Sequence, residues 1–415
     1  MKKLNTYLLA LLTFAMFTTS CSDDDSGRKR ITISPGDNAQ NEAQTAFIEV
    51  QSGMDIYFEE GTYNFTSQLS IDDKTDVRIY GAGREKTILN FSNQTGSGEG
   101  VYASNCTQIL FQDFTVQDTQ GDALKAKDSD QVTFINVGTV WSGEPDADNG
   151  AYGLYPVQCT NVLIDGCYAY GASDAGIYVG QTTNVVVRNS VAEGNVAGIE
   201  IENTINADVY DNEAFDNTGG ILVFDLPGLT QYGSNCRLFN NNSHDNNRTN
   251  FAPEGNIVGT VPAGTGIMLL STTKVEIFEN TLTDNMFSNV ILASYLMVGE
   301  PNDPNYQSLY TDIYIHDNSH AMAGTFNESG QSEIGAFIAN FLSAYGYDQP
   351  NILMDGLTGG GICIFEADGT SFVNVHAESL NTNTGEGNPD SNLAVYTCNA
   401  DPLEAVVFEP YTSSL

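Results

Sequence analysis

Short apolar segments recur through the middle of the chain with a fixed spacing. The clearest copies contain Gly176-Ile177, Gly198-Ile199 and Gly220-Ile221, in which the glycines are 22 residues apart. A second short apolar segment precedes each copy. This period is too short for a strand–helix–strand unit, so each strand is expected to pair in parallel with its equivalent one turn later. The pattern predicts an all-β fold, a single right-handed parallel β-helix.

Asparagines mark the corners between the predicted strands, and they fall into two columns at the same period. One column holds Asn195, Asn217, Asn246 and Asn285, and the other holds Asn212, Asn241 and Asn280. Asn tolerates a left-handed backbone, and stacked Asn side chains can hydrogen-bond along the axis of a solenoid. A β-sandwich, the alternative, needs hairpin turns and longer alternating strands, and the sequence has neither.

The repeat divides the chain into four parts. Residues 1–20 are expected to be a lipoprotein signal peptide and 21–34 a flexible tether. Residues 35–320 are expected to form the β-helix, and 321–415 to add irregular rungs and a cap. The N-terminal boundary follows from apolar segments such as Ile56–Phe58, which fit the opening rungs.

The first residues have the features of an export signal. Lys2 and Lys3 precede an apolar run that is too short to span a bilayer, and the run ends in Thr18-Thr19-Ser20-Cys21. Cleavage there would leave Cys21 as a lipidated N-terminus, although an ordinary signal with a chance cysteine is the alternative. The acidic residues that follow resemble the export signal of Bacteroidota surface lipoproteins. This favours a lipid anchor in the outer membrane at the cell surface, with the periplasmic face as the alternative.

The charge of the chain limits the classes of molecule that it can bind, and its cysteines indicate one candidate disulfide. The formal net charge is −38, and no Lys or Arg follows Lys274. Such a surface repels nucleic acid and anionic lipid, and it repels uronate polymers unless Ca²⁺ bridges them. In an oxidising compartment Cys363–Cys398 is a candidate disulfide, whereas Cys106 and Cys159 lie about two rungs apart, too far to bridge at roughly 4.8 Å per rung.

Alternation along the repeated strands predicts one outward face with three columns of side chains. They are Lys125, Tyr155, Tyr178, Glu200, Leu222 and Met268; then Lys127, Val157, Gly180, Glu202, Phe224 and Leu270; then Asp128, Gln158, Gln181, Asn203, Asp225 and Ser271. Long insertions flank this face, so a groove is expected, with Trp141 at its edge. Aromatic rings there would suit the apolar faces of sugars.

The groove offers several kinds of chemistry. Glu200 and Glu202 have Cα atoms roughly 6–7 Å apart, a spacing that overlaps what an inverting glycosidase needs. Tyr178 or Lys125 could abstract a proton next to a uronate carboxyl in a lyase or epimerase. The candidate catalytic residues are therefore Tyr178, Glu200, Glu202 and Lys125.

Further residues complete the predicted site. Candidate sugar contacts are Tyr155, Gln158, Gln181, Asn203, Asp225 and Trp141, and candidate Ca²⁺ ligands are Glu200, Glu202, Asp225 and Asp174. The alternative is that the two glutamates are solvated surface acids and that the tyrosines only stack on the outside of the solenoid.

Four runs carry a family resemblance: 149–159, 174–181, 198–203 and 220–227. They resemble the parallel β-helix repeat lipoproteins of the pectin-lyase-like superfamily. The resemblance implies the fold, an extracytoplasmic location and a c-type-cytochrome-like exported protein as a partner.

Signatures of the better-known enzymes on this fold are missing. The sequence has no Gly-His-Gly of the polygalacturonases and no Asp-Pro-His-Glu of the mannuronan epimerases. The protein is therefore expected to bind a polysaccharide and, if it is an enzyme, to modify it as a lyase, epimerase or hydrolase. The alternative is a non-catalytic structural or adhesive module that docks a protein partner.

Overall fold

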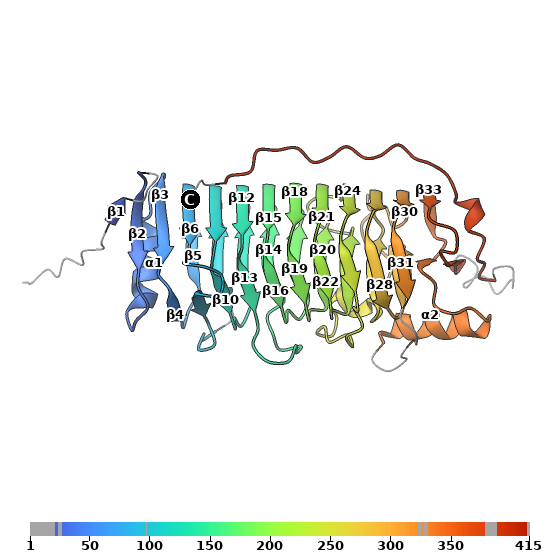
Figure 1. The fold of residues 1–415 in the computed structure, drawn as a ribbon, viewed down its shortest axis with the longest axis horizontal. Helices are drawn as coiled ribbons and strands as arrows, with labels where there is room; N and C mark the ends of the chain where they lie inside the picture. Colours follow the sequence, from blue (N-terminus) through green and yellow to red (C-terminus); the bar gives the residue numbers. More distant parts are fainter. Residues whose placement is uncertain are drawn as a thin grey trace, which may run out of the picture.

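The computed structural model describes residues 21–23, 27–96, 98–322, 326, 331–377 and 388–412. The predicted signal peptide lies outside these residues. The chain winds into a long solenoid whose rungs follow one another from the N-terminal to the C-terminal end (Figure 1). Within the described residues no helix is long and apolar enough to cross a membrane.

Three sheets form the walls, and almost all strand pairs are parallel. Sheet A comprises β1 (Cys21–Asp23), β2 (Lys29–Ile33), β3 (Met54–Phe58), β6 (Thr75–Tyr80), β9 (Thr107–Gln112), β12 (Asp130–Ile135), β15 (Thr160–Asp165), β18 (Thr183–Arg188), β21 (Ile205–Tyr210), β24 (Ser234–Phe239), β27 (Thr273–Phe278), β30 (Tyr310–His316) and β33 (Thr358–Phe365). Sheet B comprises β4 (Gly61–Asn64), β7 (Thr87–Asn90), β10 (Thr115–Gln117), β13 (Gly138–Val140), β16 (Tyr168–Tyr170), β19 (Val191–Glu193), β22 (Glu213–Phe215), β25 (Asn242–His244), β28 (Thr281–Asn285) and β31 (Ser319–Met322). Sheet C comprises β5 (Leu69–Asp72), β8 (Val101–Ser104), β11 (Leu124–Lys127), β14 (Tyr152–Val157), β17 (Ala175–Gly180), β20 (Ala197–Glu202), β23 (Gly219–Phe224), β26 (Thr265–Leu270), β29 (Ser288–Ala293), β32 (Ile352–Met354) and β34 (Phe372–Asn374).

The register confirms the period expected from the sequence. Ile177 pairs with Ile199, and Ile199 pairs with Ile221, one rung further on. All three side chains are fully buried in one continuous core. Because each strand hydrogen-bonds to the next, a side chain on one rung lies directly beside its equivalents on the two neighbouring rungs.

The two asparagine columns are hydrogen-bonded ladders. Asn217 donates to the side-chain oxygen of Asn246 at 2.9 Å and accepts from the side chain of Asn195 at 3.1 Å. The second ladder connects Asn212, Asn241, Asn280 and Asn318 in the same way. The left-handed backbone, however, belongs to the residue before each ladder position, such as Asp211 or Asp216, and not to the ladder asparagine.

The N-terminal end differs from the expected tether. Residues 21–34 contain β1 and β2, and β2 pairs in parallel with β3 because Ile31 and Ile33 are apolar enough to enter the core. Helix α1 (Ala39–Glu49) follows, and its Phe47 is buried in the same core. The solenoid therefore begins before residue 35.

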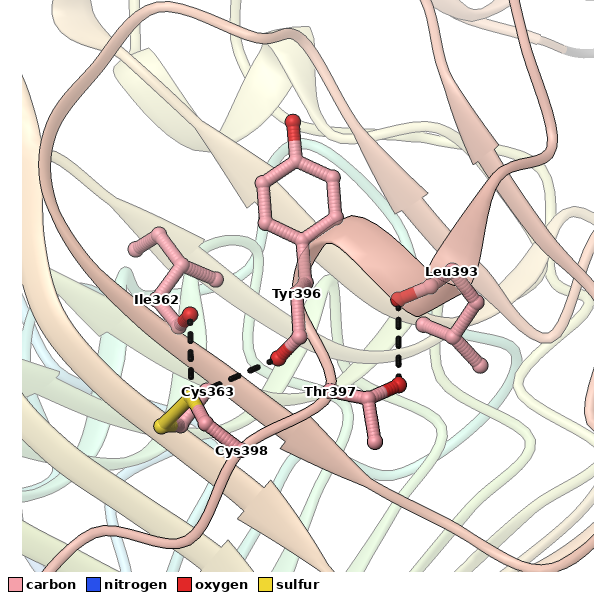
Figure 2. Close-up of a disulfide and its surroundings, with 6 residues drawn as sticks. All are labelled: Ile362, Cys363, Leu393, Tyr396, Thr397 and Cys398. Atoms are coloured by element: carbon pink, nitrogen blue, oxygen red, sulfur yellow. Dashed lines mark hydrogen bonds between the residues drawn. A yellow bond between two sulfur atoms is a disulfide. The ribbon is translucent and has the colours of Figure 1, made fainter.

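The C-terminal region continues the sheets and then turns back. Strands β32, β33 and β34 extend sheets A and C past residue 320. Helix α2 (Glu333–Ala344) lies outside the repeat, as do the short 3₁₀ helices η1 (Ile257–Thr260) and η2 (Tyr295–Met297). A third 3₁₀ helix, η3 (Leu393–Val395), follows β34. The candidate disulfide is confirmed, since Cys363 of β33 is bonded to Cys398 (Figure 2). Cys106 and Cys159 are buried free thiols.

Beyond Cys398 the chain runs back along the outside of sheet A (Figure 1). The backbone N–H of Leu403 donates to Glu276, and that of Val406 donates to Asp208. The Tyr411 hydroxyl reaches Asp76 on β6. This segment, residues 399–412, is called the C-terminal strap below.

Candidate functional site

The outward face of sheet C has the columns expected from the sequence. Lys125 pairs with Tyr155, Tyr178 pairs with Glu200, and Glu200 pairs with Leu222. The rings of Tyr155 and Tyr178 contact each other with centroids 4.9 Å apart. The predicted stacking of these side chains on one face is therefore confirmed.

The same face changes character halfway along. From β23 onward its outward side chains are apolar and buried, beginning with Leu222, Met268 and Ile291. They form a second apolar cluster with Val258 of η1 and with Leu342 of α2. The C-terminal half of the face is therefore covered by the chain itself, and the predicted groove does not continue over it.

Three carboxylates lie where the polar half meets the covered half. The exposed fractions of Asp174, Glu200 and Glu202 are 5 %, 1 % and 7 %. The alternative that the two glutamates are solvated surface acids is therefore wrong. The insertion before β26 adds Asn256, whose side-chain N–H donates to Asp174 at 3.1 Å, and this contact helps to close the cluster from outside.

The carboxylates of the cluster differ in the hydrogen bonds that they accept. The Tyr178 hydroxyl donates to Glu202 at 2.6 Å, and the Gln181 amide donates to the same oxygen at 3.1 Å. By contrast, Oε2 of Glu200 is buried and has no hydrogen-bond partner. A buried carboxylate oxygen without a donor costs free energy, so this atom is the clearest sign of a missing partner.

Burial and mutual repulsion raise the pKa values of the acids in the cluster. Burial, followed by the charge of Glu202, raises the pKa of Asp174 to about 7. Burial and the charges of Asp174 and Glu202 raise the pKa of Glu200 well above its ordinary value. Burial also raises the pKa of Glu202, although the Tyr178 hydrogen bond opposes the shift. Asp174 therefore titrates close to neutral pH, and Glu200 keeps its proton to a higher pH than an exposed carboxyl would.

The predicted base Lys125 lies in a different group. Its ammonium contacts Glu99 and Asp122, each at 3.3 Å, and lies 4.4 Å from the centre of the Tyr155 ring. Tyr155 therefore joins the Lys125 group to Tyr178. Burial raises the pKa of the Tyr155 phenol, with the charge of Asp122 as the next cause, and the phenol stays protonated at neutral pH.

The remaining predicted sugar contacts are dispersed. Asp225 is buried and accepts the backbone N–H of Gly233, and burial raises its pKa to about 7. Asn203 is also buried, and its amide binds the backbone oxygens of Leu226 and Gln231, which makes it a structural residue. Gln158 lies in a surface depression between sheets C and A, beside Asp128 and Asp130.

The expectation for Trp141 is wrong. Only 4 % of this residue is exposed, and its indole N–H donates to the backbone oxygen of Thr119 at 2.8 Å. Trp141 directly follows β13, where the chain turns out of sheet B, so strand alternation does not apply to it. Its ring belongs to the core and cannot stack on a sugar.

The predicted Ca²⁺ ligands gain no support from the geometry. Within the described ranges no group of three or more His, Cys, Asp and Glu side chains is arranged to hold a metal ion. Asp225 is held by Gly233, and Glu202 is held by Tyr178 and Gln181. A Ca²⁺ site built from Glu200, Glu202, Asp225 and Asp174 stays a prediction from the sequence.

Three residues that the sequence did not single out complete the site. Tyr152 lies on β14, its hydroxyl donates to Asp174 at 3.4 Å, and its ring contacts Tyr178 at 4.4 Å. Asp122 lies two residues before β11, and the strand register could have indicated it. Asn256 comes from a loop 82 residues away from Asp174, and no periodic signal could have placed it there.

Comparisons with known proteins agree with this architecture. The family model described as a right-handed β-helix region matches residues 147–296. No curated protein matches the sequence. Among solved structures, the chain is similar to the A-module of a mannuronan C-5 epimerase from Azotobacter vinelandii, at 16 % identity and a TM-score of 0.55 over 80 % of this chain and 91 % of that one.

A second similar structure is the full-length tailspike protein 2 of Escherichia coli O157:H7 bacteriophage CAB120. It has 12 % identity and a TM-score of 0.50, and the match covers 80 % of this chain but only 42 % of the tailspike. At these identities the likeness concerns the fold alone. Together with the three sheets, these matches confirm that the protein is an all-β, right-handed parallel β-helix.

Proposed function

We propose that this protein binds a polysaccharide on the outward face of sheet C and modifies it there. One sugar unit would contact Asp174, Glu200, Glu202 and Tyr178. The observation that carries the proposal is the buried Oε2 of Glu200, which lacks a hydrogen-bond donor in the middle of this face. Sugar hydroxyls are donors of the kind that this atom lacks. The similarity to an epimerase module whose substrate is mannuronan supports the same class of ligand.

The cluster has the acid–base properties that glycosidic chemistry requires. An acid with a pKa near the working pH can both donate and accept a proton, and the pKa of Asp174 is raised to about 7. Tyr178 can hold a sugar oxygen once its bond to Glu202 is exchanged. These groups fit a hydrolase, a lyase or an epimerase, all of which move protons at one sugar unit.

A panel of polysaccharides tests this function. The chain without its lipid would be incubated with alginate, pectin, ulvan and neutral glycans, with and without Ca²⁺, while unsaturated products and reducing ends are followed. Glu200→Gln and Tyr178→Phe should abolish turnover and keep the fold. Glu254→Gln, an exposed acid in the loop that carries Asn256, should leave turnover unchanged. Full activity in both site variants would exclude these residues from the mechanism.

The near-complete burial of Glu200 also favours a second candidate function. A site this closed fits a non-catalytic structural or adhesive module that docks a protein partner, such as the c-type-cytochrome-like protein implied by the sequence resemblance. Recovery of one tightly bound protein in a pull-down, with no turnover of any glycan in the panel, would favour this function.

We further propose that the protein is exported and anchored to the outer membrane at the cell surface by lipid on Cys21. The proposal rests on the charged start, the apolar run and the Thr18–Cys21 motif of the sequence. Labelling of growing cells with a clickable palmitate analogue should mark the protein and fail to mark Cys21→Ala. Digestion of intact cells with added protease would distinguish the cell surface from the periplasmic face.

A further inference from the structure

The acid cluster on sheet C has no counter-ion of its own. Among the described residues no ion pair involves Asp174, Glu200 or Glu202. The cations on the same face are already paired, Lys125 with Glu99 and Asp122, and Lys127 with Asp128. Buried carboxylates are usually paired with a cation or coordinated to a metal, and this cluster has neither arrangement.

The rest of the chain cannot supply the missing charge. No Lys or Arg follows Lys274, so helix α2 lacks a basic side chain, and Arg248, at the start of the loop that carries Asn256, is already paired with Asp216. The group that closes the cluster from outside is the neutral amide of Asn256. In the free protein these acids are neutralised by protons, so a cation that would let them ionise must come with a ligand.

We propose that the sugar unit bound at Asp174, Glu200 and Glu202 carries an ammonium group, so that the ligand is a glycan of amino sugars with free amines. This inference rests on the proposed function and specifies its substrate class. An ammonium offers three N–H donors. One donor would satisfy the unpartnered Oε2 of Glu200, and the others would face Glu202 and Asp174.

The same electrostatics disfavour the other sugar classes. A uronate would bring a fourth carboxyl next to three buried acids, would keep them protonated and would supply no opposite charge. An N-acetylated sugar offers a single neutral N–H and leaves the cluster uncompensated. The net charge of −38 acts at longer range in the same direction, since it attracts cationic polymers and repels anionic ones.

Three matched tetrasaccharides test the inference by calorimetric titration of the lipid-free chain at a slightly acid pH. They are the β-1,4-linked glucosamine tetramer, its fully N-acetylated form and a mannuronate tetramer. We expect the glucosamine tetramer to bind at least about tenfold more tightly than either of the others. Glu200→Gln should weaken that binding about tenfold, whereas Glu254→Gln, which removes an exposed charge from the covering loop, should change it less than about twofold.

The outcomes separate this inference from the proposed function. Equal binding of the acetylated or mannuronate tetramer, lost in Glu200→Gln, would overturn the ammonium inference and leave glycan binding at this site intact. Glucosamine binding that is the same in Glu200→Gln and Glu254→Gln would reveal general attraction to an acidic protein and also overturn the inference. If none of the three tetramers binds, the inference fails, and the polysaccharide panel alone decides the proposed function.

Discussion

Glu200 lies at the centre of the site and illustrates a conflict between stability and binding at the scale of one residue. Its carboxyl is buried, lacks a partner at Oε2 and faces two further acids. Folded proteins accept such arrangements where a ligand later supplies the missing interaction. The consequences can be measured without knowing the ligand.

The isosteric change Glu200→Gln should stabilise the free protein. It removes a titratable group that burial and two neighbouring acids hold away from its charged form. We expect the free energy of unfolding at neutral pH to rise by about 1–2 kcal/mol, because the folded protein no longer has to keep a proton on this carboxyl that the unfolded chain releases. Urea titration measures this, with Glu254→Gln as the exposed control. A clear loss of stability in Glu200→Gln would mean that the carboxyl already has a favourable partner.

The buried acids should also make stability depend on pH. The pKa of Asp174 and that of Asp225 are both raised from 3.8 to about 7. The folded state thus binds more protons than the unfolded state between these values, and stability falls as pH rises through this window. We expect Tm to drop by several degrees between pH 5 and pH 8.

The double variant Asp174→Asn, Glu200→Gln provides the control for this pH dependence. Because two of the buried acids are then unable to titrate, its Tm should vary less over the same range. An unchanged slope would show that other groups cause the dependence.

For single residues, the sequence predicted which face of the solenoid a side chain lies on better than it predicted what surrounds that side chain. Alternation and period correctly placed Tyr178 beside Glu200 on one face. They could not reveal that Asn256 arrives from a distant loop, or that Trp141 leaves its strand and enters the core. Burial of an outward side chain depends on what packs over it, and a repeat pattern contains no information about insertions.

At the scale of elements, the asparagine ladders fix the corners of the solenoid. Each ladder side chain is buried and forms hydrogen bonds with the backbone and the side chain of its neighbour. Asn217, for example, donates to the backbone oxygen of Ala192 at 3.0 Å and to Asn246, and accepts the backbone N–H of Asn195 at 2.9 Å. The sequence predicted these columns but assigned the left-handed backbone to the wrong residue. The ladder position needs a side chain that donates and accepts hydrogen bonds, while the residue before it adopts the left-handed backbone of the turn.

Truncation in the middle of a ladder should therefore be costly. Asn217→Ala removes buried hydrogen bonds to Asn195, Asn246 and Ala192, and we expect the free energy of unfolding to fall by about 2–4 kcal/mol. The matched control is Asn184→Ala, at a half-buried corner whose side chain donates to Asn161 and accepts from Asn206. Urea titration should show a much smaller loss there. Equal losses in the two variants would contradict a special role for the buried ladder.

For the whole molecule, the sequence predicted the solenoid because each rung repeats the same pattern. The parts that break the period could not be predicted in this way. Helix α2 covers the apolar half of sheet C, and the C-terminal strap runs back along sheet A from β33 to β6. A solenoid otherwise connects each rung only to its neighbours. The strap adds contacts between rungs that are far apart.

Removal of the strap should therefore loosen the molecule as a whole. A chain ending at Cys398 keeps the disulfide to Cys363 but loses the bonds to Glu276, Asp208 and Asp76. The carboxyls of Glu276 and Asp208 are almost fully buried in the intact protein, and truncation exposes them together with the outer face of sheet A. We expect Tm to fall by several degrees, and the amides of β21 and β27 to exchange hydrogen faster. Hydrogen-exchange mass spectrometry measures both strands, with β20 and β26 of sheet C as internal controls. Equal acceleration in sheets A and C would indicate a general loss of stability, whereas unchanged exchange in sheet A would show that the strap contributes nothing to holding the rungs together.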